Sequence, residues 1–170
     1  MMHMNEPVTM LTDVALGASS LAFAFLLYRI IGPWNRVSAW LWCAGFITSA
    51  VAALSGATYH GFKLYFDPGT LRAFWNVIVY SMGASAGLMV AGCHAAYIRK
   101  EDGVIKWLTA GIAVTLIGAI VQLSGFRHNA DFNHNDAYHL IQIFGLYSFF
   151  KAATRLRDRP GIVTSQPSAD

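Results

Sequence analysis

The chain consists of long apolar stretches separated by short polar ones. Each stretch is continuous over about 20 residues or more, the length that a helix rising 1.5 Å per residue needs to cross a hydrocarbon layer of about 30 Å. None alternates between apolar and polar with a period of two, as the strands of a membrane barrel do. The pattern therefore predicts five transmembrane helices, near residues 10–31, 38–60, 72–98, 104–126 and 136–156.

The composition agrees with a membrane protein. Apolar residues make up 55% of the 170 residues and charged residues 12%, against about 25% charged in a soluble domain. We expect an all-α integral membrane bundle forming one domain, residues 1–159, followed by a disordered tail at 160–170. No Lys or Arg precedes the first stretch, so we expect it to be retained rather than cleaved as a secretion signal. Small residues let helices approach closely, and five are placed to do so: Gly83, Gly87, Gly92, Gly111 and Gly118.

The basic residues favour one orientation in the membrane. Cytoplasmic loops carry an excess of Lys and Arg, and only Lys63, Arg72 and Arg127 fall on one side of the predicted helices. We therefore expect the N-terminus outside and the C-terminus in the cytoplasm, and the compact loops suit a bacterial inner membrane. The other nine basic residues are Arg29, Arg36, Arg99, Lys100, Lys106, Lys151, Arg155, Arg157 and Arg159.

Several function classes find no support in the sequence. The formal charge is +3, but the basic residues gather at helix ends rather than in a stripe with aromatics, so we expect no nucleic-acid partner. The chain has no glycine-rich phosphate loop and no G-x-S-x-G nucleophile motif. Cys43 and Cys93 have no C-x-x-C spacing and are expected to be buried, inert thiols.

Polar residues gather at the predicted outer ends of the helices. His60 ends the second stretch, and the segment DFNHNDAYHLIQ opens the fifth with His134, Asp136 and His139. Asp13 lies about one turn into the first stretch, at the same depth. Imidazoles and a carboxylate at one level are natural zinc ligands. Asp136 and His139 share a helix face, whereas His134 is expected to join from the turn before the helix, which Asn133 or Asn135 would cap.

Other polar residues have plainer explanations. We expect His3 and His128 to be solvated and His94, toward the cytoplasmic end of the third stretch, to be structural. Asp13 has two open interpretations. It is either a functional carboxylate with a partner inside the bundle or an anion stabilised by the dipole at the start of a helix.

Two short segments resemble the CREST superfamily of membrane hydrolases, which includes alkaline ceramidases and the progestin and adiponectin receptors. GATYHGF is similar to its S-x-x-x-H segment, and DFNHNDAYHLIQ to the paired histidines of its last helix. The resemblance implies zinc bound by His60, His134 and His139. The family serine would fall on Gly56, with Ser55 one residue away. The third stretch holds no aspartate, only Asn76, so Asp13 or Asp136 would supply the family's catalytic carboxylate.

These observations lead to a hypothesis of zinc-dependent hydrolysis of a lipid amide or ester at the outer interface, similar to the ceramidases. Zinc-bound water would supply hydroxide, with Asp136 or Asp13 as the base. Membrane lipid is the expected partner, and a groove for it would involve Tyr59, Trp75, Asn76 and Tyr138, although Tyr and Trp also serve as interface anchors.

Two alternative functions stay open. His60 and His139 would be axial ligands of haem b in an electron-transfer subunit. In a non-enzymatic receptor or assembly protein, a metal would instead only fasten the helices together. A homo-oligomer formed through the glycine faces is compatible with either function.

Overall fold

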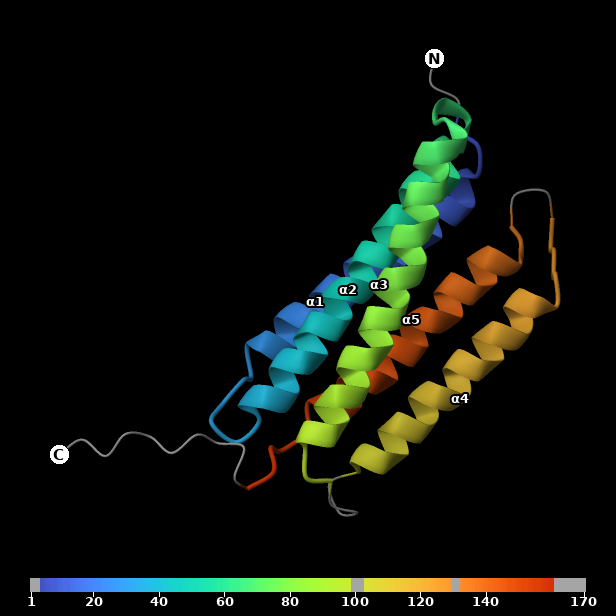
Figure 1. Ribbon diagram of the computed structural model, residues 1–170. Coiled ribbons are helices and arrows are strands. Elements are labelled where there is room, and N and C mark those ends of the chain that lie inside the picture. Colours follow the sequence, from blue (N-terminus) through green and yellow to red (C-terminus); the bar gives the residue numbers. More distant parts are fainter. Residues whose placement is uncertain (1–3, 99–102, 130–131, 161–170) are drawn as a thin grey trace.

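The computed structural model describes residues 4–98, 103–129 and 132–160, and within them the fold is all-helical. His3, Arg99, Lys100 and the predicted disordered tail beyond residue 160 lie outside these ranges. The elements run antiparallel in succession, so that their ends gather at two opposite ends of the molecule (Figure 1). They are α1 (Pro7–Tyr28), α2 (Arg36–Phe62), the 3-10 turn η1 (Lys63–Tyr65), α3 (Pro68–Ala95), α4 (Val104–Leu123) and α5 (His134–Ala153).

Capping residues explain why α3 and α5 begin earlier than the apolar stretches predict. Asp67 caps α3, accepting hydrogen bonds from the backbone N–H groups of Gly69 and Thr70, with Pro68 in the first turn. Asn133 caps α5 and accepts from the N–H of Asn135. These caps are polar residues outside the hydrophobic pattern, so the pattern alone places the start of α3 four residues late and that of α5 two residues late, whereas α4 begins at Val104 as predicted.

The helices form two layers that meet along α1 and α5. The first layer holds α1, α2 and α3, with α2 packed between its two neighbours, and α5 lies between α1 and α4 (Figure 1). Aromatic rings fill the contact between the layers: Phe23 lies 5.3 Å from Phe150, and Trp42 lies 6.1 Å from Phe149, measured between ring centroids. This core fixes how α5 sits against the first layer.

Three of the five highlighted glycines lie where another helix packs closely. A Cβ atom at Gly92 would lie 2.5 Å from Trp42, one at Gly111 2.5 Å from Phe149, and one at Gly118 2.8 Å from Gln142. A side chain at Gly83 or Gly87 would meet nothing within 4 Å. The prediction of close packing is therefore confirmed for the first three, whereas Gly83 and Gly87 face away from the described part of the chain.

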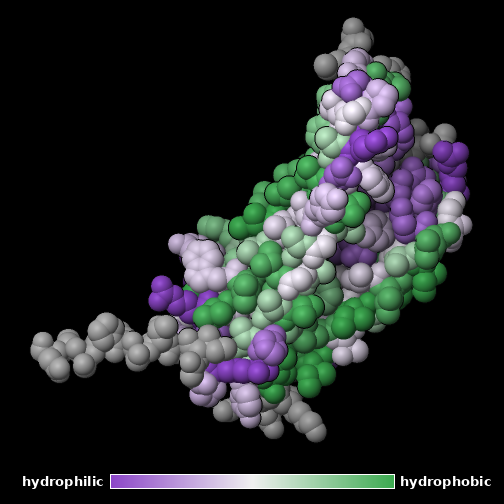
Figure 2. All heavy atoms as spheres, in the orientation of Figure 1, coloured by the Kyte–Doolittle hydropathy of each residue, from purple (hydrophilic) through white to green (hydrophobic). Residues whose placement is uncertain are grey.

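Four helices are long and apolar enough to cross a membrane: α1, α2 with η1, α3 and α4. On the face shown in Figure 2, hydrophobic residues cover much of the middle of the bundle, and the most hydrophilic residues collect toward its two ends. The described chain is thus compatible with a multi-pass membrane protein. α5 is not among the four because it carries several polar residues. It buries Asp136, His139 and Gln142 while exposing Leu140 and Phe144, so its polar face points into the bundle.

The two ends of the bundle are built differently. At one end lie the α1–α2 and α3–α4 connections and the chain after α5, and we call this the closed end, residues 29–35, 96–98 and 154–159. There Asp158 accepts hydrogen bonds from the N–H groups of Val37 and Ser38 at 2.7 and 2.9 Å, and the N–H of Tyr97 donates to the carbonyl of Arg157 at 2.7 Å. The opposite end holds Asn5, Glu6, η1 and the α4–α5 connection, and we call it the pocket end.

Candidate functional site

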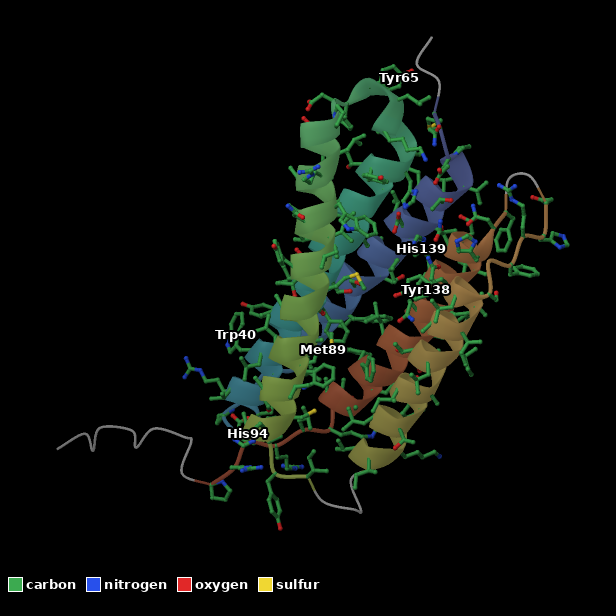
Figure 3. All side chains as sticks on the ribbon, turned by 45° about the vertical axis from the view of Figure 1, so that its right-hand side comes forward. Trp40, Tyr65, Met89, His94, Tyr138 and His139 are labelled. Atoms are coloured by element: carbon green, nitrogen blue, oxygen red, sulfur yellow. The ribbon has the colours of Figure 1, made fainter. Side chains whose placement is uncertain are left out.

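Two residues of α1 and two of α5 form a buried polar cluster near the pocket end. The hydroxyl Oγ1 of Thr12 lies 3.1 Å from Nδ1 of His139 and 3.5 Å from Oδ1 of Asp136. The other ring nitrogen of His139, Nε2, lies 3.3 Å from Oδ1 of Asp13. Asp136 is 0%, Asp13 3% and His139 9% exposed. Figure 3 shows His139 on α5, pointing toward α1. We call Thr12, Asp13, Asp136 and His139 the acid–base cluster.

The hydrogen bonds of the acid–base cluster define a consistent protonation pattern. When Nε2 of the neutral His139 ring carries the proton, it donates to Asp13, and Nδ1 is left to accept from the Thr12 hydroxyl. The result is a chain of hydroxyl, imidazole and carboxylate across the α1–α5 contact. Such a chain holds the imidazole ring in one orientation. When the ring gains a proton, the charge of the carboxylate stabilises it.

Local structure positions each member of the cluster. Asp136 occupies the third position of α5, where its Oδ2 accepts from the N–H of Asn133 at 2.7 Å, completing a capping box. This fixes the carboxylate at the start of the helix. His139 follows three residues later on the same face. On the other side, a Cβ at Gly56 of α2 would lie 2.9 Å from Oδ2 of Asp13, so only glycine lets α2 pack against this carboxylate.

Two buried oxygens near the cluster have no hydrogen-bond partner among the described residues: Oδ2 of Asp13 and Oγ1 of Thr9. A buried polar atom without a partner costs about 1–3 kcal/mol. Thr9 is one helical turn before Thr12 and Asp13 on α1, toward the pocket end. The site therefore keeps an unused acceptor at Asp13 and an unused hydroxyl at Thr9.

A second polar group lies closer to the surface of the pocket end. Glu6 pairs with Nδ1 of His60 and with the ammonium group of Lys63. Partial burial raises the pKa of Glu6, but the hydrogen bonds from Lys63 and His60 and the charges of both outweigh it, so the pKa lies below its ordinary value. His60 is thus committed to a carboxylate that precedes α1.

Beside this group the pocket end is hollowed by a polar pocket of about 640 Å³. Residues from the start of α1, from η1, from the α4–α5 connection and from the start of α5 line it, among them Glu6, Thr9, Lys63, Arg127 and His134. His134 is the first residue of α5 and faces this pocket rather than preceding the helix in a turn. Thr9 connects the pocket with the acid–base cluster along α1.

The structure brings together some of the residues expected from the sequence. Of the five polar groups expected at one level, Asp13 contacts His139, and Asp136 shares the hydroxyl of Thr12 with His139. His60 instead pairs with Glu6, and His134 lines the pocket. Among the described residues no group of three His, Cys, Asp or Glu side chains is arranged to hold a metal ion. The predicted zinc shell of His60, His134 and His139 does not fit this arrangement, and zinc stays a hypothesis.

The other residues expected at the site form none of the hydrogen bonds of the acid–base cluster. Ser55 is half-buried on α2 and makes none of the cluster's hydrogen bonds, whereas the neighbouring Gly56 contacts Asp13. Tyr59 packs against His60 and Trp75, with ring centroids 5.4 and 6.2 Å apart. Trp75 and Asn76 are exposed on α3. Tyr138 packs beside His139 at 5.6 Å, so of the four expected groove residues it is the one next to the acid–base cluster.

Three residues of the site were not found from the sequence: Thr9, Thr12 and Glu6. Thr9, Thr12 and Asp13 are spaced by three and one, which places all three on one side of a helix. This polar stripe at the start of an apolar stretch was the available signal. Nothing in the sequence indicated that Glu6 would reach the end of α2. His94 lies at the opposite end of the bundle and is exposed, away from the site (Figure 3).

Comparison with known families adds one finding. Residues 8–95 and 73–158 both match the DUF6962 family, described as a family of unknown function. Together the two matches cover most of the chain. The chain belongs to the DUF6962 family. Its matched segments contain the whole acid–base cluster, since Thr12 and Asp13 lie in the first and Asp136 and His139 in the second. No curated protein and no solved structure shows significant similarity to the chain.

Proposed function

We propose that this DUF6962 protein is an integral membrane hydrolase that cleaves an amide or ester bond of a lipid at the membrane surface. The observation that carries the proposal is the buried chain of Thr12, His139 and Asp13, with Oδ2 of Asp13 left without a partner. Ionisable groups inside a membrane bundle are costly, and they usually mark a functional site. The pocket at the same end gives polar substrate atoms a place next to Thr9, which lies one helical turn before Thr12 and Asp13 on α1.

In this proposal α5 crosses the membrane with the other four helices. Its polar residues face α1, where they are shielded from lipid, and its apolar residues face outward. We place the closed end in the cytoplasm, because most of the Lys and Arg residues lie there or in the connections that lead to it. The pocket end then faces the outside, which is the periplasm if the membrane is a bacterial inner membrane.

In the proposed reaction, the oxygen Oδ2 of Asp13, which has no partner among the described residues, acts as the base. Oδ2 of Asp13 removes a proton from a water molecule, and the water oxygen forms a bond with the carbonyl carbon of the substrate. The carbon–nitrogen or carbon–oxygen bond then breaks, and the proton held on Asp13 passes to the leaving group. His139 holds the other oxygen of Asp13, and Thr12 fixes the ring tautomer. Asp136 adds a second carboxylate beside the Thr12 hydroxyl.

The test is turnover of fluorescent ceramides and fluorescent phospholipid esters by the detergent-purified protein. We expect hydrolysis of at least one of these classes, and we expect His139→Ala to slow it about 100-fold or more, as for loss of a group acting in proton transfer. His94→Ala is the matched control, since this histidine is exposed at the other end. Turnover that survives unchanged in His139→Ala refutes the proposal.

A second candidate function is favoured by the mutual pairing within the cluster. The same hydrogen bonds would fasten α1 to α5 in a non-enzymatic receptor or assembly protein. The variant His139→Ala separates the two functions. A fastening role predicts that the wild type turns over no lipid and that the variant has a much lower thermal stability than the wild type. A red protein with a Soret band would instead support haem b bound by His60 and His139.

The zinc hypothesis has its own test. Elemental analysis of the purified wild type beside His60→Ala and His139→Ala is expected to show stoichiometric zinc in the wild type alone if these residues are ligands. Equal metal content in the three proteins removes the zinc site. The proposed role of Asp13 does not depend on the result.

A further inference from the structure

The pocket at the pocket end combines basic side chains with an unsatisfied hydroxyl. Lys63 enters it from η1, Arg127 from the α4–α5 connection and His134 from the first turn of α5. The backbone of Arg127 pairs with that of Asn133, which holds the arginine next to the start of α5. Three separate chain segments therefore direct basic groups to one volume of about 640 Å³.

The charges around the pocket leave it a positive excess. The single carboxylate lining it, Glu6, is already paired with Lys63 and with His60. Arg127 is exposed and forms no ion pair with a carboxylate in the described ranges. An anion entering the pocket would meet Arg127 without displacing a carboxylate partner from the described residues.

The buried hydroxyl of Thr9 is a second feature of the pocket, separate from its basic side chains, that suits an anion. This residue lines the pocket, is only 1% exposed, and its Oγ1 has no hydrogen-bond partner within the part of the chain described. Threonine in a helix commonly donates to a carbonyl one turn earlier, as Thr48 does to Ala44 at 3.0 Å in α2. The hydroxyl of Thr9 is instead left over, buried and next to a space with basic walls. Such a donor is suited to an anionic oxygen.

We propose that this pocket binds a phosphate ester, with Arg127 and Lys63 pairing with its charge and the Thr9 hydroxyl donating to one of its oxygens. The lipid-compatible surfaces of α3 and α4 end close to the pocket (Figures 1 and 2), which makes the head group of an anionic phospholipid the favoured source over free phosphate. Binding stands on the pocket alone. Its use in recognising a substrate rests on the proposed hydrolase function.

Binding is tested on the full-length protein in detergent. Titration with short-chain phosphatidylglycerol is compared with phosphatidylcholine, and inorganic phosphate is the second arm. We expect phosphatidylglycerol to bind at least about tenfold more tightly than phosphatidylcholine, the difference made by about one charge-assisted contact. Competition by millimolar inorganic phosphate would support the phosphoryl site and point to a soluble ligand, and its absence would assign the site to lipid.

Three variants make the assignment specific. Arg127→Gln and Thr9→Val are each expected to weaken phosphatidylglycerol binding about fivefold to tenfold. Thr9→Val keeps the side-chain shape and the backbone carbonyl oxygen, which lies 3.0 Å from Oγ1 of Thr12. Arg72→Gln is the control, because it removes the same charge from an exposed position on α3 at the same end.

Equal affinity in wild type, Arg127→Gln and Thr9→Val, with unchanged melting temperatures, overturns the phosphate site. Equal affinity of the wild type for phosphatidylglycerol and phosphatidylcholine overturns the choice of an anionic phospholipid, because both lipids carry the phosphate ester and differ in net charge. The readout is binding, so the outcome is separate from that of the hydrolase proposal. Asp13→Asn is expected to retain phosphatidylglycerol binding even if it abolishes turnover, because Asp13 does not line the pocket.

Discussion

The two ends of the helix bundle handle their buried polar groups in opposite ways. At the closed end, Asp158 caps the start of α2 from a distant part of the chain, and backbone groups of residues 95–97 pair with those of 157–159. At the pocket end, two carboxylates and an imidazole lie buried together, and the oxygens Oδ2 of Asp13 and Oγ1 of Thr9 lack partners among the described residues.

The difference separates stability from function. Hydrogen bonds that satisfy helix termini lower the free energy of the folded state, whereas unsatisfied buried atoms raise it. A protein keeps such atoms where a ligand or a reaction uses them. We therefore expect substitutions at the closed end to change stability without changing chemistry, and substitutions of Thr12 and Asp13 in the acid–base cluster to change chemistry with little change in stability.

The largest effect on stability is expected for Asp158→Ala. The variant leaves the N–H groups of Val37 and Ser38 without their acceptor, which should lower the free energy of unfolding by about 2–3 kcal/mol. Thermal unfolding in detergent measures the change. Lipid binding and turnover per folded molecule should match the wild type. A variant with unchanged stability would show that this contact does not hold the closed end.

An intermediate effect is expected for Thr12→Val. The substitution removes the hydroxyl that Nδ1 of His139 accepts from, and one such bond is worth about 1 kcal/mol, or about fivefold in rate. The melting temperature should fall only slightly, since the side-chain shape is kept. Steady-state kinetics would show the loss in kcat rather than KM. A change confined to KM would mean that Thr12 contacts substrate instead.

The smallest effect concerns pH. The pKa of Glu6 is lowered in the folded protein by its contacts with Lys63 and His60, so these contacts stabilise the fold above the ordinary glutamate pKa of 4.5 and the stabilisation is lost as pH falls through the lowered value. Unfolding curves between pH 7 and pH 3 should show this loss in the wild type. Glu6→Gln should be less stable at pH 7 and lose less on acidification. Parallel pH profiles for the two proteins would contradict this role.

The sequence predicted the helices well because long apolar stretches leave few alternatives in a membrane. It also predicted that Asp136 and His139 share a face, which follows from their spacing of three, and that Asp13 lies at their depth. It did not predict the partners. His60 pairs with Glu6, a residue in the polar segment before α1, and no periodicity places such a segment against the end of α2.

Thr9 and Thr12 were missed for a different reason. Threonine is common in apolar helices, where its hydroxyl is satisfied by the preceding turn, so it gives a weak signal beside charged residues. At Gly56 the sequence departs from the membrane hydrolases that it resembles. The resemblance to the membrane hydrolases places a serine there, but the structure packs the Asp13 carboxylate against this position, where a side chain would lie 2.9 Å from its oxygen.

The central claim is tested most directly by measuring lipid turnover and thermal stability together for the wild type, Asp13→Asn and Asp158→Ala. Asp13→Asn keeps the size of the side chain but removes the base, so we predict a loss of about 100-fold or more in rate with a melting temperature at or above that of the wild type. Asp158→Ala should show the opposite pattern. A folded Asp13→Asn protein that hydrolyses lipid as fast as the wild type would contradict the account.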